Sequence, residues 1–183
     1  MKALKFWAKL SVLATISLIL ALPAGSLAQQ DYYFDSDASF DEDIPSPNEF
    51  LGYNIGSHYT RYDRIVSYFQ KLAEASEKAS FQTIGQTYEY RLQIVLTITS
   101  AENLENLEQI RKKHQSVLDP SAPELDPQTD PSIVKLDYSV HGDETSSAEA
   151  AMLTAYYMIA EQGSETQNFL DESVILIDPA LNP

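Results

Sequence analysis

The segment at residues 173–178, Ser-Val-Ile-Leu-Ile-Asp, constrains the fold of this chain most strongly. Its four central residues are all apolar, which is typical of a strand buried on both faces of a sheet. A β-rich segment at residues 132–140 and a helical segment at residues 146–161 precede it. Strand, helix and strand in this order predict a right-handed parallel crossover in an α/β fold. The helix is expected to face inward with Ala148, Ala151, Met152, Ala155, Tyr156 and Ile159.

An antiparallel hairpin is predicted upstream of the crossover. Residues 81–89 and 92–99 are rich in β-branched and aromatic side chains, and a short turn around Tyr90 separates them. Four prolines in the acidic stretch 119–131 predict a loop between the hairpin and the crossover, since proline removes backbone donors. The resulting sheet would be mixed, with helices on its faces.

Two helices are predicted to flank the hairpin strands. One covers residues 60–79, with Thr60 as a plausible N-cap, and the other covers residues 101–115. Both have apolar side chains at helical spacing, which predicts one buried face each. These side chains are Ile65, Tyr68, Phe69 and Leu72 in the first helix, and Leu104, Leu107 and Ile110 in the second.

The first 28 residues are predicted to be a cleavable secretory signal peptide. Three lysines lie within the first nine residues, an apolar run covers residues 10–22, and Ser-Leu-Ala at residues 26–28 supplies small residues for cleavage. The alternative is a membrane anchor, but the run is shorter than the roughly 20 residues that a bilayer span needs. The mature protein is therefore expected to be secreted or periplasmic. Residues 29–49 are expected to form an acidic flexible N-terminus, with docking of its aromatic residues on the domain as the alternative, and residues 50–183 the folded domain.

The charge of the chain argues against two kinds of partner. It contains 27 acidic and 12 basic residues, with a formal net charge of −15. Such a surface repels nucleic acid and anionic membranes, so neither is expected to bind. The chain has no cysteine, so disulfides cannot stabilise it outside the cell. Its stability must come from the core, helped by any metal it binds.

The pattern His141-Gly-Asp-Glu144 is the candidate metal site. It lies between a predicted strand and a predicted helix, where ligands bind in open α/β sheets. An imidazole nitrogen and a carboxylate oxygen both bind zinc well, and a tight turn at Gly142 could direct both at one ion. The alternative is structural: acidic residues favour a helix N-terminus, which Thr145 or Ser146 would cap.

Three segments in the same order resemble the zinc carboxypeptidase family, and more narrowly its secreted bacterial members. They are the strand with His141-Gly-Asp-Glu144, the Ala-rich helix after it, and residues 174–183, which end in Asn-Pro. Upstream, the segment Gly-Gln-Thr-Tyr-Glu-Tyr-Arg at residues 85–91 resembles the family hairpin Gly-x-Ser-x-Glu-Gly-Arg. The resemblance covers roughly residues 50–183 and implies a mixed-sheet zinc carboxypeptidase fold.

The resemblance also implies a site. His141 and Glu144 match two of the three Zn²⁺ ligands, and Arg91 matches a hairpin arginine that can reach the peptide substrate. Tyr90 stands where the family has glycine, which leaves a second interpretation of Arg91 open, a surface arginine paired with an acidic neighbour. The implied reaction is zinc-dependent removal of C-terminal residues, in which the metal activates water and a glutamate transfers the proton.

The resemblance covers only the N-terminal part of the family domain. The third zinc ligand, the Asn-Arg pair that binds the substrate carboxylate, and the catalytic glutamate have no counterpart in this chain, and His58 and His114 are expected to be surface residues. A truncated domain is therefore expected, with weak metal binding and negligible activity alone. A separately encoded C-terminal half is a candidate partner. The strand at residues 173–178 is expected to be an open, aggregation-prone sheet edge.

Two other functions stay open at this point. Zinc-dependent amidases of small acylated amino acids share a similar His-Gly-x-Glu turn, although the signal peptide and the hairpin argue against that group. A non-catalytic peptide-binding domain that keeps the fold without the chemistry is the other alternative.

Overall fold

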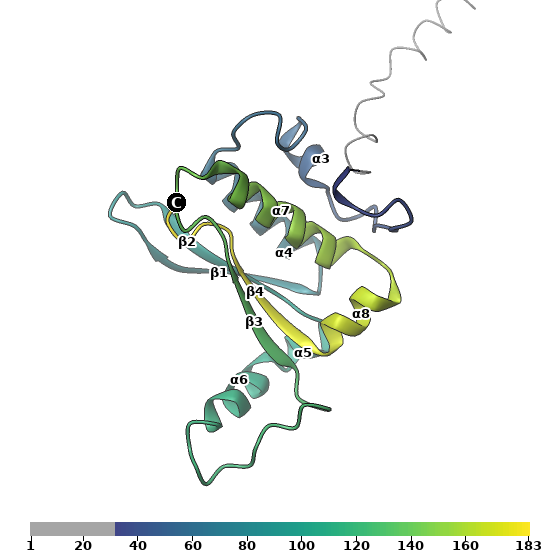
Figure 1. Ribbon diagram of the computed structural model, residues 1–183, viewed down its shortest axis with the longest axis vertical. Coiled ribbons are helices and arrows are strands. Elements are labelled where there is room, and N and C mark those ends of the chain that lie inside the picture. The colour runs from purple at the N-terminus through teal and green to yellow at the C-terminus, as the bar shows by residue number, and fades with distance from the viewer. Residues whose placement is uncertain (1–31) are drawn as a thin grey trace, which may run out of the picture. The chain divides into compact units, whose positions relative to one another are not determined.

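The protein is built on a four-stranded mixed sheet (Figure 1). The computed structural model describes residues 32–183, so the predicted signal peptide lies outside the described residues. Residues 37–183 form one compact unit. The strands follow the order β1-β2-β4-β3. Their bounds are Ala79–Gln86 for β1, Leu92–Ile98 for β2, Ser132–Asp137 for β3 and Ser173–Asp178 for β4.

The pairing of the strands confirms the α/β prediction. β1 and β2 form an antiparallel hairpin, β2 pairs antiparallel with β4, and β3 pairs parallel with β4. The hairpin and the parallel crossover therefore join in a single sheet, with β4 at its centre. Ile94, Leu96, Ile98, Ile175 and Ile177 from β2 and β4 are fully buried.

Two long helices lie side by side over this sheet (Figure 1). α4 packs against β1 and β2, and α7 packs against β2 and β4. All six predicted inward residues of α7 are buried, as are the four predicted for α4. No helix within residues 32–183 has the length and apolar character needed to cross a membrane. The helices are α3 Pro47–Leu51, α4 Tyr62–Ala75, α5 Ala101–Glu105, α6 Leu107–Ser116, α7 Thr145–Ala160 and α8 Ser164–Asp171.

The start of α4 differs from the prediction. Arg61, not Thr60, is the N-cap residue, and its side chain makes no capping hydrogen bond. Thr60 is buried, and its hydroxyl lies 2.9 Å from the Tyr53 hydroxyl. Its backbone N–H donates to Glu149 Oε1 at 3.0 Å. Thr60 therefore joins the loop before α4 to α7, a tertiary role that a capping pattern does not reveal.

The helix predicted over residues 101–115 is divided at Asn106. Its side-chain amide donates to the Glu102 carbonyl, and its backbone φ of −98° and ψ of 8° end α5 there. α6 follows directly, and none of the residues of α5 or α6 is fully buried. The predicted apolar face is thus only half-covered. α8 was not predicted, because only two of its eight residues, Phe169 and Leu170, are apolar.

Packing begins earlier than residue 50. Phe40 forms a β-bridge with Glu161 and stacks on Tyr156, with ring centroids 5.1 Å apart. Ile44 is buried, and a capping box between Ser46 and Glu49 starts α3. The contacts of Phe40 correspond to the docking of aromatic residues that the sequence left as an alternative. Aromatic and capping contacts hold this segment, while its acidic side chains Glu42 and Asp43 stay exposed.

β4 is an inner strand, and the edge strands of the described sheet are β1 and β3. Because β2 pairs with one side of β4 and β3 with the other, β4 is central and buried, and the prediction of an open edge at residues 173–178 is wrong. β3 also ends at Asp137, so it is shorter than the strand predicted over residues 132–140, and its side chains are mostly exposed. Within the described sheet, β4 is the one neighbour of β3.

We expect Ile133→Lys to reduce self-association of the chain. Ile133 is 40% exposed on β3, and a lysine on an edge strand opposes strand addition. Light scattering across a concentration series measures the effect. Val117→Lys replaces a 56% exposed apolar side chain outside the sheet and serves as the control. Equal behaviour of the two variants would show that the β3 edge does not drive association.

Candidate metal site and adjoining cavity

A short loop after β3 positions the candidate metal ligands. Ser139 is buried and has a φ of 46°, in the left-handed region. Its backbone N–H donates to the Ser147 hydroxyl at 2.8 Å, and its own hydroxyl donates to the His141 carbonyl at 3.2 Å. These bonds connect the loop to α7 on one side and to the His141 backbone on the other. Ser139 thus fixes the path of the chain just before His141.

The C-terminal segment holds the same loop from another side. The Leu181 N–H donates to the Tyr138 carbonyl at 2.9 Å, and the Asn182 N–H donates to the Ser139 carbonyl at 3.2 Å. This contact explains Gly142, because a Cβ there would lie 2.4 Å from the Asn182 backbone oxygen. Glycine is required at this position by close approach of two backbones.

His141 and Glu144 both lie exposed at the start of α7. The Glu144 N–H donates to the His141 carbonyl at 3.1 Å, which closes a tight turn. Glu144 is the N-cap residue of α7, yet its side chain makes no capping hydrogen bond. Since α7 starts at Thr145, the alternative in which Thr145 or Ser146 caps the helix is wrong. The carboxylate of Glu144 therefore makes no hydrogen bond to the backbone N–H groups at the start of α7.

The donor set fits zinc in part. Imidazole and carboxylate are zinc ligands, and both side chains are accessible to an ion. Residues 32–183 contain no group of three His, Asp or Glu side chains arranged to hold a metal. His58 instead lies beside the Tyr53 ring, and His114 Nε2 lies 2.8 Å from the Pro131 carbonyl oxygen. The described chain therefore offers two candidate ligands.

Arg91 lies at the hairpin turn, in an ion pair with Glu89 at 2.9 Å. The Thr87 hydroxyl accepts backbone N–H groups of Glu89 and Arg91, which organises the turn. Tyr90 has a φ of 63°, the conformation that glycine adopts most easily. The turn therefore requires at position 90 a backbone conformation typical of glycine, although the residue there is tyrosine.

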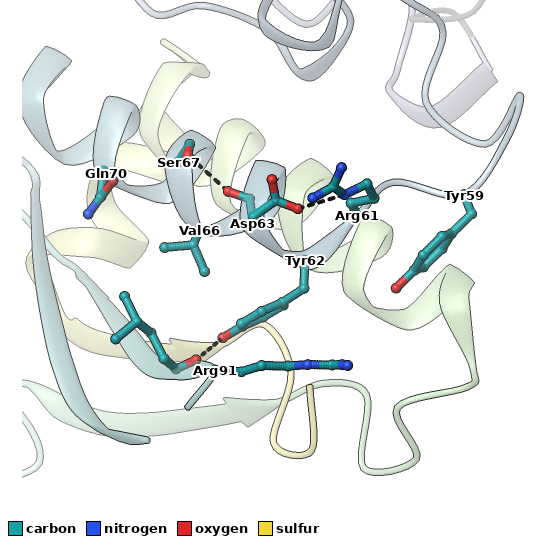
Figure 2. A pocket seen from close by; sticks show the side chains of 9 residues that line it. Tyr59, Arg61, Tyr62, Asp63, Val66, Ser67, Gln70 and Arg91 are labelled. Carbon is teal, nitrogen blue, oxygen red and sulfur yellow. Dashed lines mark hydrogen bonds and ion pairs between the residues drawn. The ribbon is translucent and has the colours of Figure 1, made fainter. Parts of the chain in front are cut away.

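A cavity of about 550 Å³ adjoins Arg91 (Figure 2). It lies between the first turns of α4 and the start of β2. The Tyr62 hydroxyl donates to the Leu92 carbonyl at 2.7 Å, and burial raises the pKa of this phenol, with a smaller contribution from the charge of Asp178. The cavity is lined by Tyr59, Arg61, Tyr62, Asp63, Val66, Ser67, Gln70, Arg91 and Leu92.

Two buried carboxyl groups escaped the sequence analysis. Asp178, at the end of β4, is only 1% exposed, and its Oδ1 accepts the Ala180 N–H. Burial, and then the neighbouring Asp137 charge, raise the pKa of Asp178. Its Oδ2 has no hydrogen-bond partner among the described residues. Glu149 on α7 accepts the Thr60 N–H. The sequence signal that could have indicated a buried Asp178 is its position directly after the apolar run at residues 174–177.

Gly142→Ala is expected to lower stability by roughly 1–3 kcal/mol, because the new Cβ meets backbone that cannot move aside cheaply. Thermal unfolding measures the loss. Gly85→Ala is the matched control, since its Cβ would lie 3.3 Å from the flexible end of Gln93. A Gly142→Ala variant as stable as Gly85→Ala would contradict the proposed close packing of the terminal segment.

Tyr90→Asn is expected to stabilise the hairpin by about 1 kcal/mol, because asparagine tolerates the left-handed conformation better than tyrosine. Tyr90 is 81% exposed, so little packing is lost. Chemical denaturation measures the gain, and Tyr88→Asn provides the control on the same turn, where the side chain is fully exposed. An equal gain in stability in both variants would show that it comes from removing a surface tyrosine and not from relieving backbone strain at position 90.

Comparison with known proteins identifies the family of the chain. The profile of the zinc carboxypeptidase family matches residues 65–183. No curated protein matches the chain significantly. The solved structure of thrombin activatable fibrinolysis inhibitor is similar at 15% identity and a TM-score of 0.48, over 78% of this chain and 28% of that chain. Because the family profile covers more than half of its 183 residues, this chain belongs to the zinc carboxypeptidase family.

Proposed function

We propose that this chain contributes to zinc-dependent removal of C-terminal residues from peptides. The observation that carries the proposal is the loop after β3, where His141 and an uncommitted Glu144 carboxylate stand exposed in a member of this family. Backbone hydrogen bonds from Leu181 and Asn182 support that loop. The loop is thus built to present side chains rather than only to connect two elements.

His141 and Glu144 are the residues that would hold the metal. When bound, zinc supplies a Lewis acid that polarises the substrate carbonyl and lowers the pKa of water. The protein's part is positioning: Ser139 holds the His141 backbone, and Gly142 lets the terminal segment approach the loop. Arg91 is proposed to contact the peptide substrate from the hairpin.

The remaining parts of the site are proposed to come from outside these 183 residues. A third ligand, a general base and a group that binds the substrate carboxylate are needed for the reaction. They could be supplied by a longer form of the protein or by a separately encoded C-terminal half. No strand of residues 32–183 pairs with the outer side of β3, which is compatible with further strands joining the sheet there. Alone, the chain would bind zinc weakly.

Export is part of the proposal. Residues 1–28 have the charge, apolar run and cleavage site of a secretory signal peptide, so the protein is proposed to act in the periplasm or outside the cell, as in secreted bacterial members. Its acidic surface makes nucleic acid and anionic membranes poor partners.

A second candidate function is peptide binding without catalysis. The cavity beside Arg91 favours it, because α4, the residues just before α4 and the hairpin line this cavity without any candidate metal ligand. In that case the loop around His141 would be a structural feature retained from the family.

We expect the full chain to bind Zn²⁺ in a 1:1 ratio, more weakly than about micromolar, because only two ligands are present. His141→Ala and Glu144→Gln should each weaken binding by roughly tenfold or more, while His114→Ala should leave it unchanged. Calorimetry measures the affinity. Equal affinity in the wild-type chain and all three variants would refute the metal site.

The catalytic part of the proposal has its own test. Hydrolysis of a blocked dipeptide with a free carboxylate should be negligible with the chain alone, and an acylated amino acid should also be left intact. Tight 1:1 zinc binding together with turnover of the dipeptide would overturn the proposed incompleteness. Turnover of the acylated amino acid alone would identify an amidase instead.

A further inference from the structure

The turn after β4 connects a buried carboxyl group to the candidate metal loop. Asp178, the last residue of β4, is 1% exposed, and its Oδ1 accepts the Ala180 N–H at 3.1 Å. This bond closes a tight turn, of the kind in which an aspartate side chain takes the place of a backbone carbonyl. Ala180 is itself buried, so its N–H depends on Asp178 for a partner.

The turn directs the terminal segment onto the base of the loop. The Leu181 N–H donates to the Tyr138 carbonyl at 2.9 Å, and the Asn182 N–H donates to the Ser139 carbonyl at 3.2 Å. The backbone carbonyl of Asp178 also accepts the Tyr138 N–H, at 2.9 Å. Asp178 therefore holds the base of the loop in two ways, through its own backbone and through the turn. In Figure 1 the end of the chain lies beside the loop that leads into α7.

The second carboxyl oxygen of Asp178 takes no part in this turn. Asp178 Oδ2 is buried and has no hydrogen-bond partner within residues 32–183. A buried anionic oxygen without a donor is costly, so this environment favours the protonated form. Asp137 lies opposite Asp178 in the parallel register and adds a second negative charge. Burial, and then the Asp137 charge, accordingly raise the pKa of Asp178.

The other ionisable groups around Asp178 do not supply the missing donor. Lys135 is paired with Asp137 at 2.7 Å and offsets only part of its effect. Strand β2, on the other side of β4, has no ionisable side chain, and neither does the segment after β4. On α4 and α7, the Tyr62 hydroxyl and the Glu149 carboxylate are each bound to backbone groups. The ionisable side chains of the loop itself are exposed, namely His141, Asp143 and Glu144.

We propose that Asp178 is a positioning residue for the candidate metal loop, and that it acts as a neutral carboxyl group. Its Oδ1 closes the turn that places the terminal segment, and a proton on Oδ2 removes the charge repulsion with Asp137. Ionisation of Asp178 would put two carboxylates side by side at the ends of β3 and β4, and the terminal segment would loosen from the loop. The inference rests on the proposed function only for the role of the loop in metal binding.

Amide hydrogen exchange of the full chain tests the positioning without any metal. Asp178→Leu keeps the size of the side chain but removes the acceptor, so the Leu181 and Asn182 amides should exchange about tenfold faster or more. Asp178→Asn retains an acceptor for the turn and should keep the wild-type exchange rates. Asp126→Ala is the control, because it removes a similar bond from the Gln128 N–H in the loop before β3. Equal rates in Asp178→Leu and the wild type would overturn the proposal.

The charge state has a test that needs only Asp178→Asn, whose amide resembles the neutral acid. An acid whose pKa is raised on folding stabilises the folded state below its ordinary pKa, and this contribution is lost as the pH rises through the raised value. The wild-type Tm should therefore fall relative to that of Asp178→Asn between about pH 4 and about pH 8. A constant difference in Tm over this range would overturn the neutral form.

Asp119→Asn is the control for the pH series. Hydrogen bonds from Ser121 lower the pKa of Asp119, so this carboxylate is ionised in both the folded and the unfolded chain above about pH 4. The difference in Tm between the wild type and Asp119→Asn should therefore stay constant over the same range. An equal trend in both variants would assign the effect to general charge and overturn the specific role of Asp178.

Zinc affinity separates this inference from the proposed function. If the wild-type chain binds Zn²⁺, Asp178→Leu should weaken binding by about tenfold, while Asp178→Asn and Asp126→Ala should not weaken it. Faster exchange at Leu181 and Asn182 in a chain that does not bind zinc would refute the metal site and keep the positioning role. Unchanged exchange in Asp178→Leu, with zinc binding by the wild type intact, would refute the positioning role alone.

Discussion

The parallel pairing of β3 with β4 supports the candidate metal loop, because it sets where both strands end. Asp137 lies opposite Asp178, so the chain leaves the two strands at the same level of the sheet. The loop before α7 and the C-terminal segment then run together, joined by backbone hydrogen bonds from Leu181 and Asn182. The absence of a side chain at Gly142 allows this contact. A shift in register would separate the two segments and leave the loop unsupported.

A second constraint lies at the hairpin turn. Tyr90 adopts a left-handed conformation, so the turn keeps the backbone path of a glycine turn despite the bulkier residue. The Thr87 hydroxyl offsets part of the strain by accepting two backbone N–H groups. The result is that Arg91 lines a cavity and pairs with Glu89 at the same time. The two interpretations of this arginine are therefore compatible, because a weak surface pair does not prevent ligand binding.

Charge is distributed unevenly over the end of the sheet that carries these sites. Asp178 and Asp137 place carboxyl groups between β4 and β3, and the pKa of Asp178 is raised by burial and then by Asp137. The cavity beside β2, the strand next to β4, is lined by two arginines and by Asp63.

The amino-acid sequence by itself determined the order of hairpin and crossover and the buried faces of α4 and α7. Local periodicity and turn chemistry carry that information. His141 and Glu144 stay candidate ligands, and Arg91 is a candidate through the family resemblance alone. Tertiary structure alone decided that β4 is an inner strand and β3 an edge strand, because β2 pairs with β4 across a long sequence separation. It also decided the role of Thr60 and the burial of Asp178. Such contacts depend on which elements pack together, and no local pattern in the chain encodes that.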